Sequence, residues 1–146
     1  MKVHAKNLEG IGTITGYNHL AVFLRWMCEH HLLSERLVTE FPELPDIIAE
    51  KRCDLREIIR SAPQFNGRLC RGHFNEEGQE FANLFYVFGR GAYPSCVDDY
   101  AKQVLGEEKY HCAEYKNEAY LYVPYEEEYY QGVSRYIDEA WEKLML

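Results

Sequence analysis

The segment from residue 17 to residue 33, Tyr-Asn-His-Leu-Ala-Val-Phe-Leu-Arg-Trp-Met-Cys-Glu-His-His-Leu-Leu, decides how this chain folds. It contains no Gly or Pro, and its apolar residues recur at helical spacing on two faces, one through Leu24 and Met27 and the other through Val22 and Trp26. A helix that is apolar on two faces is buried on both. We therefore expect a helix of about four to five turns at the centre of the core.

Helical patterns recur downstream of this segment. Residues 46–51 are predicted to begin a short helix, and Asp54 is predicted as the N-cap of the next helix, which stops before Pro63. Asn75 marks a third start, although Gly78 inside that helix costs about 1 kcal/mol relative to alanine. A fourth helix follows Pro94, with Ser95 as its expected N-cap and Gly106 as its stop.

The C-terminal part of the chain predicts one strand and one long helix. Residues 119–123 (Ala-Tyr-Leu-Tyr-Val) read as a strand, whose candidate partners are residues 10–15 and 67–70. Pro124 is expected in the first turn of the final helix. The expected buried stripe of that helix is Tyr129, Val133, Tyr136, Ile137, Ala140, Trp141 and Leu144. The predicted fold class is mainly α (α+β), a compact single domain over residues 1–146 with about five to six helices and a minor short-stranded sheet.

Length and composition favour one folded, soluble domain. The chain has 146 residues, 47% of them hydrophobic, and no window approaches the roughly 18 consecutive apolar residues of a membrane span. No secretory signal is visible after Met1, so we expect a cytoplasmic location. The five cysteines are odd in number and form no Cys-x-x-Cys pair, which favours reduced thiols over disulfides or structural zinc.

Charge is divided unevenly along the chain. Residues 1–73 carry ten Lys or Arg against nine Asp or Glu, whereas residues 74–146 carry six against fifteen, which gives the overall net charge of −8. Eleven of the twelve tyrosines lie in the acidic half. Aromatic rings offer rigid contact area, and a field of one sign speeds encounter with a basic protein while it repels nucleic acid and anionic membranes.

These features predict a protein-binding surface at the acidic residue runs. The expected partner-binding residues are Asp98, Asp99, Glu107, Glu108, Tyr125, Glu126, Glu127, Glu128 and Tyr129. The same carboxylates also fit a solvated face, and those that follow Pro124 complement the positive end of a helix. Self-association through the tyrosines is left open by the sequence.

Signals for chemistry are sparse. His30 and His31 are adjacent, so on a helix they point about 100° apart rather than toward one ion, and we expect no metal or other cofactor. Cys112 beside His111 lacks the spacing of a nucleophile and its base. The alternative function is a small enzyme that acts on phosphate or nucleic-acid substrates through Arg68, Arg71 and His73.

Several stretches carry a resemblance to a known group of proteins. They are residues 16–34, residues 74–83, residues 93–101 (Tyr-Pro-Ser-Cys-Val-Asp-Asp-Tyr-Ala) and residues 118–125 (Glu-Ala-Tyr-Leu-Tyr-Val-Pro-Tyr). The chain resembles an uncharacterised bacterial domain family of immunity-like proteins, the antidotes of polymorphic-toxin and contact-dependent inhibition systems. The resemblance implies a non-catalytic binding protein that neutralises a basic toxin, such as a nuclease, and it brings no catalytic residues.

Overall fold

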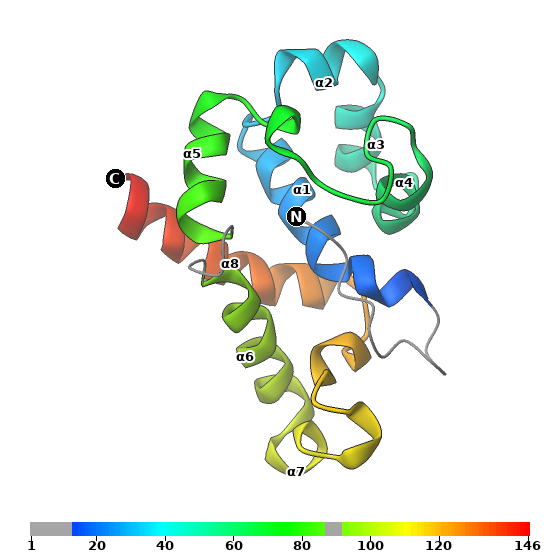
Figure 1. Ribbon diagram of the computed structural model, residues 1–146, viewed down its shortest axis with the longest axis vertical. Helices are drawn as coiled ribbons and strands as arrows, with labels where there is room; N and C mark the ends of the chain where they lie inside the picture. The colour runs from blue at the N-terminus through cyan, green and yellow to red at the C-terminus, as the bar shows by residue number, and fades with distance from the viewer. Residues whose placement is uncertain (1–12, 87–91) are drawn as a thin grey trace.

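Helix α1 (Asn18–Glu29) lies in the middle of the computed structural model, as the sequence predicts (Figure 1). The structure describes residues 13–86 and 92–146. Nine of the 12 residues of α1 are buried, which explains its apolar pattern on two faces. The helix ends earlier than predicted because His31 takes a left-handed conformation with φ of 58°, and the Leu32 N–H turns back to the Met27 carbonyl at 2.9 Å.

Short helices precede and follow α1. They are η1 (Thr13–Tyr17), α2 (Glu35–Glu40), α3 (Leu44–Glu50), α4 (Leu55–Ser61) and η2 (Arg71–His73), where η denotes a 3₁₀ helix. Of these, η1, α3 and α4 pack on α1, and α2 packs on η2. Helix α3 begins two residues earlier than predicted, at Leu44, because Pro45 fits within its first turn. The predicted start of α4 is confirmed, and the Asp54 side chain caps this helix by accepting the Arg56 N–H. Helix α2 was not predicted, although the Ser34 hydroxyl caps it by accepting the Leu37 N–H at 3.0 Å.

The second half of the chain is also helical. Its elements are α5 (Glu76–Phe85), α6 (Tyr93–Leu105), α7 (Glu107–Tyr110), η3 (Ala113–Tyr115), η4 (Ala119–Tyr122) and α8 (Glu127–Met145). Asn75 caps α5 as predicted, and Gly106 ends α6 as predicted. The Ser95 prediction is wrong because α6 already begins at Tyr93. Pro94 sits in the first turn, where the N–H that proline lacks would have no partner within the helix.

The predicted sheet is absent from the part of the chain that the structure describes. Residues 119–122 form the 3₁₀ helix η4 instead of a strand, and an isolated antiparallel bridge joins Leu33 to Phe74. Of the candidate partner strands, residues 13–15 are wound into η1, and residues 10–12 lie outside the described residues. Residues 67–70 form no strand. The mainly α class is therefore correct, with eight α-helices in the described ranges, and the sheet is not.

Helix α8 crosses α1 and also packs on α5 and α6 (Figure 1). Its start differs from the prediction because Pro124 precedes the first turn instead of lying in it. Tyr129, Val133 and Ile137 are buried as predicted. Leu144 is 41% exposed, and Tyr130 is buried although it was not in the predicted stripe.

One aromatic core joins the two halves of the chain. Phe23 of α1 contacts Phe74, Phe81, Tyr86 and Tyr93, with ring centroids 5.1 to 6.3 Å apart. Trp26 of α1 lies 5.7 Å from Trp141 of α8, centroid to centroid, and donates its indole N–H to Asp138 at 2.9 Å. The positions of α6 and α8, which carry most of the predicted binding residues, are therefore set by α1 and its neighbours.

Candidate functional site

The structure divides the nine predicted binding residues between two places. One group surrounds the beginning of α8 and contains Tyr125, Glu126, Glu127, Glu128 and Tyr129. The other group lies on α6 and α7 and contains Asp98, Asp99, Glu107 and Glu108. Within residues 93–130, which include both groups, nine carboxylates face three lysines, for a net charge of −6.

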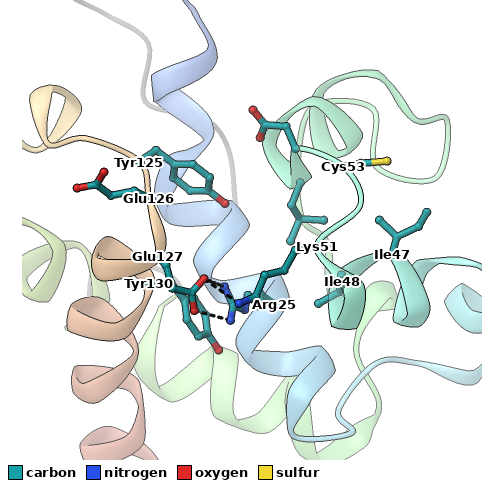
Figure 2. A pocket seen from close by; sticks show the side chains of 11 residues that line it. Arg25, Ile47, Ile48, Lys51, Cys53, Tyr125, Glu126, Glu127 and Tyr130 are labelled. Atoms are coloured by element: carbon teal, nitrogen blue, oxygen red, sulfur yellow. Dashed lines mark hydrogen bonds and ion pairs between the residues drawn. The ribbon is translucent and has the colours of Figure 1, made fainter.

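Glu127 is held by cations of the same molecule. The Arg25 guanidinium donates to both of its carboxylate oxygens at 2.9 Å, and the Lys51 ammonium lies 3.3 Å away (Figure 2). These hydrogen bonds, chiefly the pair from Arg25, lower the pKa of Glu127 to about 2. Glu127 thus fixes the start of α8 to α1, and its charge is compensated within the fold.

Tyr130 completes the attachment of α8 to α1. The Arg25 guanidinium lies 3.6 Å from the centre of the Tyr130 ring, and the Tyr130 hydroxyl donates to Glu29. Glu29 also accepts from Arg25 at 3.0 Å, so Arg25 and Tyr130 share this carboxylate. Burial, strengthened by the bond to Glu29, raises the pKa of Tyr130 well above its usual value.

The tyrosines lie deeper than a purely binding role would require. All twelve are among the described residues, and none of them is exposed. Tyr129 is 2% exposed and belongs to the core. Tyr125 is half-buried beneath the Arg56 guanidinium, which stands 4.1 Å from its ring centre, and burial raises the pKa of Tyr125 to about 12.

Glu126 and Glu128 are the exposed carboxylates beside this attachment. Figure 2 shows the Glu126 side chain directed away from the pocket that lies between α8 and the α3–α4 connection. That pocket has a volume of about 180 Å³ and apolar walls that include Ile47, Ile48 and Leu55. Pockets for small molecules and cofactors usually measure about 300–1,000 Å³. The hollow therefore suits at most one side chain.

The carboxylates of α6 and α7 have different surroundings. Asp98 accepts a hydrogen bond from the Tyr110 hydroxyl, and Glu107 pairs with Lys102 at 3.4 Å and with His111 at 3.2 Å. Asp99 and Glu108 are exposed. Asp99, Glu108, Glu126 and Glu128 are therefore the exposed carboxylates, among the predicted set, that the described structure ties to no cation.

The three residues of the alternative enzyme function are not arranged as a reactive set. His73 is 3% exposed, and both of its ring nitrogens bond to backbone groups. Nδ1 accepts the Cys70 N–H at 2.8 Å, so the proton resides on Nε2, which donates to the Gln64 carbonyl at 2.7 Å. Burial lowers the pKa of His73. Arg68 and Arg71 are exposed outside this buried ring.

The described residues contain neither a metal site nor a membrane-spanning helix. No group of three or more His, Cys, Asp or Glu in residues 13–86 and 92–146 is arranged to hold a metal ion. In the same ranges, no helix combines the length and the apolar character that crossing a membrane requires. All five cysteines are free thiols, and Cys53 is exposed.

The arrangement is that of a mainly helical domain whose exposed functional candidates are carboxylates on α6, α7 and the start of α8. A family model described as "Domain of unknown function (DUF7832)" matches residues 1–113, and the chain belongs to this family. No curated protein and no solved structure matches the chain. The match ends within η3, so α8 and its glutamates lie beyond it.

Proposed function

We propose that this protein is a non-catalytic, immunity-type binding protein that neutralises a basic toxin domain through its carboxylate-rich surface. The observation that carries the proposal is the unequal compensation of charge. The first half of the chain is nearly neutral, whereas residues 93–130 hold nine carboxylates against three lysines. The resemblance of several sequence stretches to immunity-like proteins supports the same function.

The exposed carboxylates that no cation of the fold compensates are the most accessible part of this surface for a partner. Asp99 and Glu108 lie on α6 and α7, and Glu126 and Glu128 lie at the start of α8. Such charges raise the rate of encounter with a basic protein, and salt weakens their effect. A toxin whose cleft binds nucleic acid would present a complementary positive surface.

The tyrosines contribute indirectly to this function. Tyr129 and Tyr130 are buried, Tyr129 against Tyr100 of α6 and Tyr130 against Arg25 of α1, so they attach α8 to these helices. Fixed carboxylates lose less side-chain and loop entropy on binding than mobile ones do. The tyrosines therefore favour affinity by holding the charged surface in place.

The test is recovery and functional assay of the partner. Tagged protein is used to capture partners from its native cells at low and moderate salt, and the captured proteins are identified by mass spectrometry. We expect a basic domain bound one to one, whose expression alone stops growth and whose effect is relieved when this chain is co-expressed. A partner that is acidic, or whose toxicity this chain does not relieve, would contradict the proposal.

A pair of charge-matched variants tests the location of the surface. The first carries Asp99→Asn, Glu108→Gln, Glu126→Gln and Glu128→Gln; the control carries Glu35→Gln, Glu43→Gln, Glu76→Gln and Glu77→Gln, which are exposed on other elements. Both lose four negative charges. We expect calorimetric titration to show a loss of about tenfold or more in affinity, or roughly 1.4 kcal/mol, and a shallower salt dependence for the first variant only.

A further inference from the structure

A second cavity lies between α6 and the segment that contains η3 and η4. Its volume is about 250 Å³, and its lining residues are His19, Pro94, Val97, Asp98, Asn117 and Tyr120. Helix α6 packs directly on η4, so both walls belong to elements in mutual contact. Asp98, one of the predicted binding residues, is among the lining residues.

The cavity combines an apolar wall with one carboxylate. Val97 is 3% exposed, and Pro94 and the half-buried Tyr120 ring add further apolar surface. The Asp98 carboxylate accepts one hydrogen bond from Tyr110. Because an ionised carboxylate has about four acceptor positions, it retains capacity for another donor. The bond from Tyr110 also fixes the direction of the carboxylate before any ligand arrives.

Charges on the surrounding elements favour a cation in this place. Six carboxylates and three lysines lie between residues 93 and 122. Of the lysines, Lys102 pairs with Glu107, and Lys116 is exposed next to Asn117. The positive end of α6 opposes a cation, but Asp98 is the sixth residue of that helix, and the effect of a helix end is confined to its first turn.

We propose that this cavity receives one arginine side chain of the basic partner. The inference rests on the proposed function and assigns a specific contact to it. The aliphatic part of the arginine lies along Pro94 and Val97, while its guanidinium donates to Asp98 and stacks on the Tyr120 ring. At about 250 Å³, the cavity is below the usual size of small-molecule sites, which favours a single side chain as the occupant.

Arginine fits this chemistry better than lysine. Its planar guanidinium can stack on an aromatic ring and donate in the same plane to a carboxylate, whereas an ammonium is a compact and strongly hydrated charge. An anchor that fills an apolar-walled cavity and meets a carboxylate there is the type of contact that dominates interface energetics. The exposed carboxylates would then mainly raise the rate of association with the partner, whereas the contact in this cavity would mainly lengthen the lifetime of the complex.

The first test needs no partner. N-acetyl-arginine amide is titrated into isotope-labelled protein to about 100 mM, well above the millimolar range of a contact worth about 4 kcal/mol, while backbone amide NMR signals are followed. We expect saturable shifts at Val97, Asn117 and Tyr120, and a several-fold weaker response to N-acetyl-lysine amide. Shifts that are absent, that do not saturate, or that scatter over the acidic surface would overturn the proposal.

Adjacent residues supply the matched controls. Asp98→Asn removes the charge at the cavity but keeps an acceptor for Tyr110, whereas Asp99→Asn removes the same charge from an exposed position next to it. We expect the arginine response to fall at least tenfold in Asp98→Asn and by less than twofold in Asp99→Asn. Equal losses would show a general charge effect and would overturn the cavity as the site.

A blocking variant tests the cavity without altering Asp98. Pro94→Lys places a long cation at the rim, and Ser95→Lys adds the same charge at an exposed neighbour that does not line the cavity. Pro94→Lys should abolish the localised shifts, and Ser95→Lys should preserve them. Localised arginine binding without any basic toxin partner would refute the proposed function alone, whereas toxin binding that ignores Asp98→Asn and Pro94→Lys would refute this inference alone.

Discussion

Two buried tyrosine hydroxyls differ in their hydrogen bonding. The Tyr93 hydroxyl donates to the His19 carbonyl at 2.7 Å, while the Tyr129 hydroxyl is buried without a hydrogen-bond partner in the described part of the chain. A buried polar group that lacks a partner costs about 1–3 kcal/mol. We therefore expect Tyr129→Phe to raise the free energy of unfolding by about 1 kcal/mol and Tyr93→Phe to lower it by about the same amount.

Urea titrations followed by circular dichroism would measure both changes. The two substitutions delete the same atom from rings of similar burial, so each is the control for the other. Destabilisation by Tyr129→Phe would mean that its hydroxyl is satisfied in solution. That result would contradict the absence of a hydrogen-bond partner for this hydroxyl among the described residues.

At position 78 the fold requires a glycine, and the sequence pattern does not predict this requirement. The pattern predicts only a helix weakened by glycine, but Gly78 is buried where α5 meets the chain after α1. A Cβ atom there would lie 2.9 Å from the Leu32 carbonyl oxygen and 3.1 Å from the Phe74 Cβ. Since the nearest atom belongs to the backbone, the neighbours cannot simply rotate away.

We expect Gly78→Ala to destabilise the protein although alanine favours helices. Overpacking of this kind costs about 1–3 kcal/mol, against a helix-propensity gain of at most about 1 kcal/mol. Glu80→Ala, at an exposed position of the same helix, should change stability by less than about 0.5 kcal/mol. Thermal unfolding of the two variants would compare them, and a stabilised Gly78→Ala protein would show that the α5 contact is loose.

At the scale of elements, the contact between α1 and α8 depends on Glu127. Its pKa is about 2 in the folded protein, compared with 4.5 for a free glutamate, because Arg25 and Lys51 favour the charged form. A lowered pKa stabilises the fold above pH 4.5, and this contribution disappears as the pH falls from about 4.5 to 2. The Glu127 side chain is 42% exposed, so solvent screening limits the contribution to about 1 kcal/mol or less.

Glu127→Gln should therefore lower stability by roughly 0.5–1 kcal/mol at pH 7, and the difference from the natural protein should vanish near pH 2. Glu126→Gln removes a neighbouring exposed carboxylate that no cation contacts in the described structure, and it should change stability at pH 7 by less than about 0.5 kcal/mol. Urea unfolding at pH 7, 4 and 2.5 would measure both variants. A pH-independent loss in Glu127→Gln would indicate a packing effect rather than the ion pairs.

The elements show what sequence periodicity can and cannot predict. The central helix, the caps at Asp54 and Asn75 and the stop at Gly106 follow from local patterns, and they are present. Residues 119–123 bury Ala119, Leu121 and Val123, which is the alternation typical of a strand. The same burial arises here from one 3₁₀ turn followed by an extended residue. A strand also needs a neighbour, and the sequence alone does not show that residues 13–15 form a helix.

At the scale of the whole molecule, the family match covers only part of the chain that forms the core. The match covers residues 1–113, yet Tyr129, Val133 and Ile137 of α8 are almost fully buried against the rest of the chain. A fragment of residues 1–113 would expose the surfaces of α1, α5 and α6 that α8 covers. Burial of each large apolar side chain contributes about 1.5–3 kcal/mol, so these three side chains together contribute about 5–9 kcal/mol, which is comparable to the whole stability of a typical domain.

We therefore expect the 1–113 fragment to lack a cooperative unfolding transition by circular dichroism and dispersed NMR signals. A fragment of residues 1–143 removes the exposed Leu144 and Leu146 together with Met145, and it should remain folded. A folded 1–113 fragment would show that α8 is an addition to a self-sufficient domain.

Charge at the molecular scale was readable from the sequence, but its distribution over the surface was not. Composition identifies the acidic half. It cannot show that Glu127 is paired with Arg25, which lies 102 positions away in the sequence. It likewise cannot separate Asp98, which lines a cavity, from Asp99, which is exposed beside it. These differences depend on which helices meet, and that is decided by long-range packing.

The two tryptophans make the intrinsic fluorescence of this protein specific to one place in the fold. Trp26 and Trp141 are the only tryptophans in the chain, and they meet where α8 crosses α1. The His30 ring stacks on Trp26 at a centroid distance of 3.8 Å. All intrinsic tryptophan emission therefore originates at this one crossing, with a potential quencher in contact. A change in emission on adding a partner would report the position of α8 without any attached label.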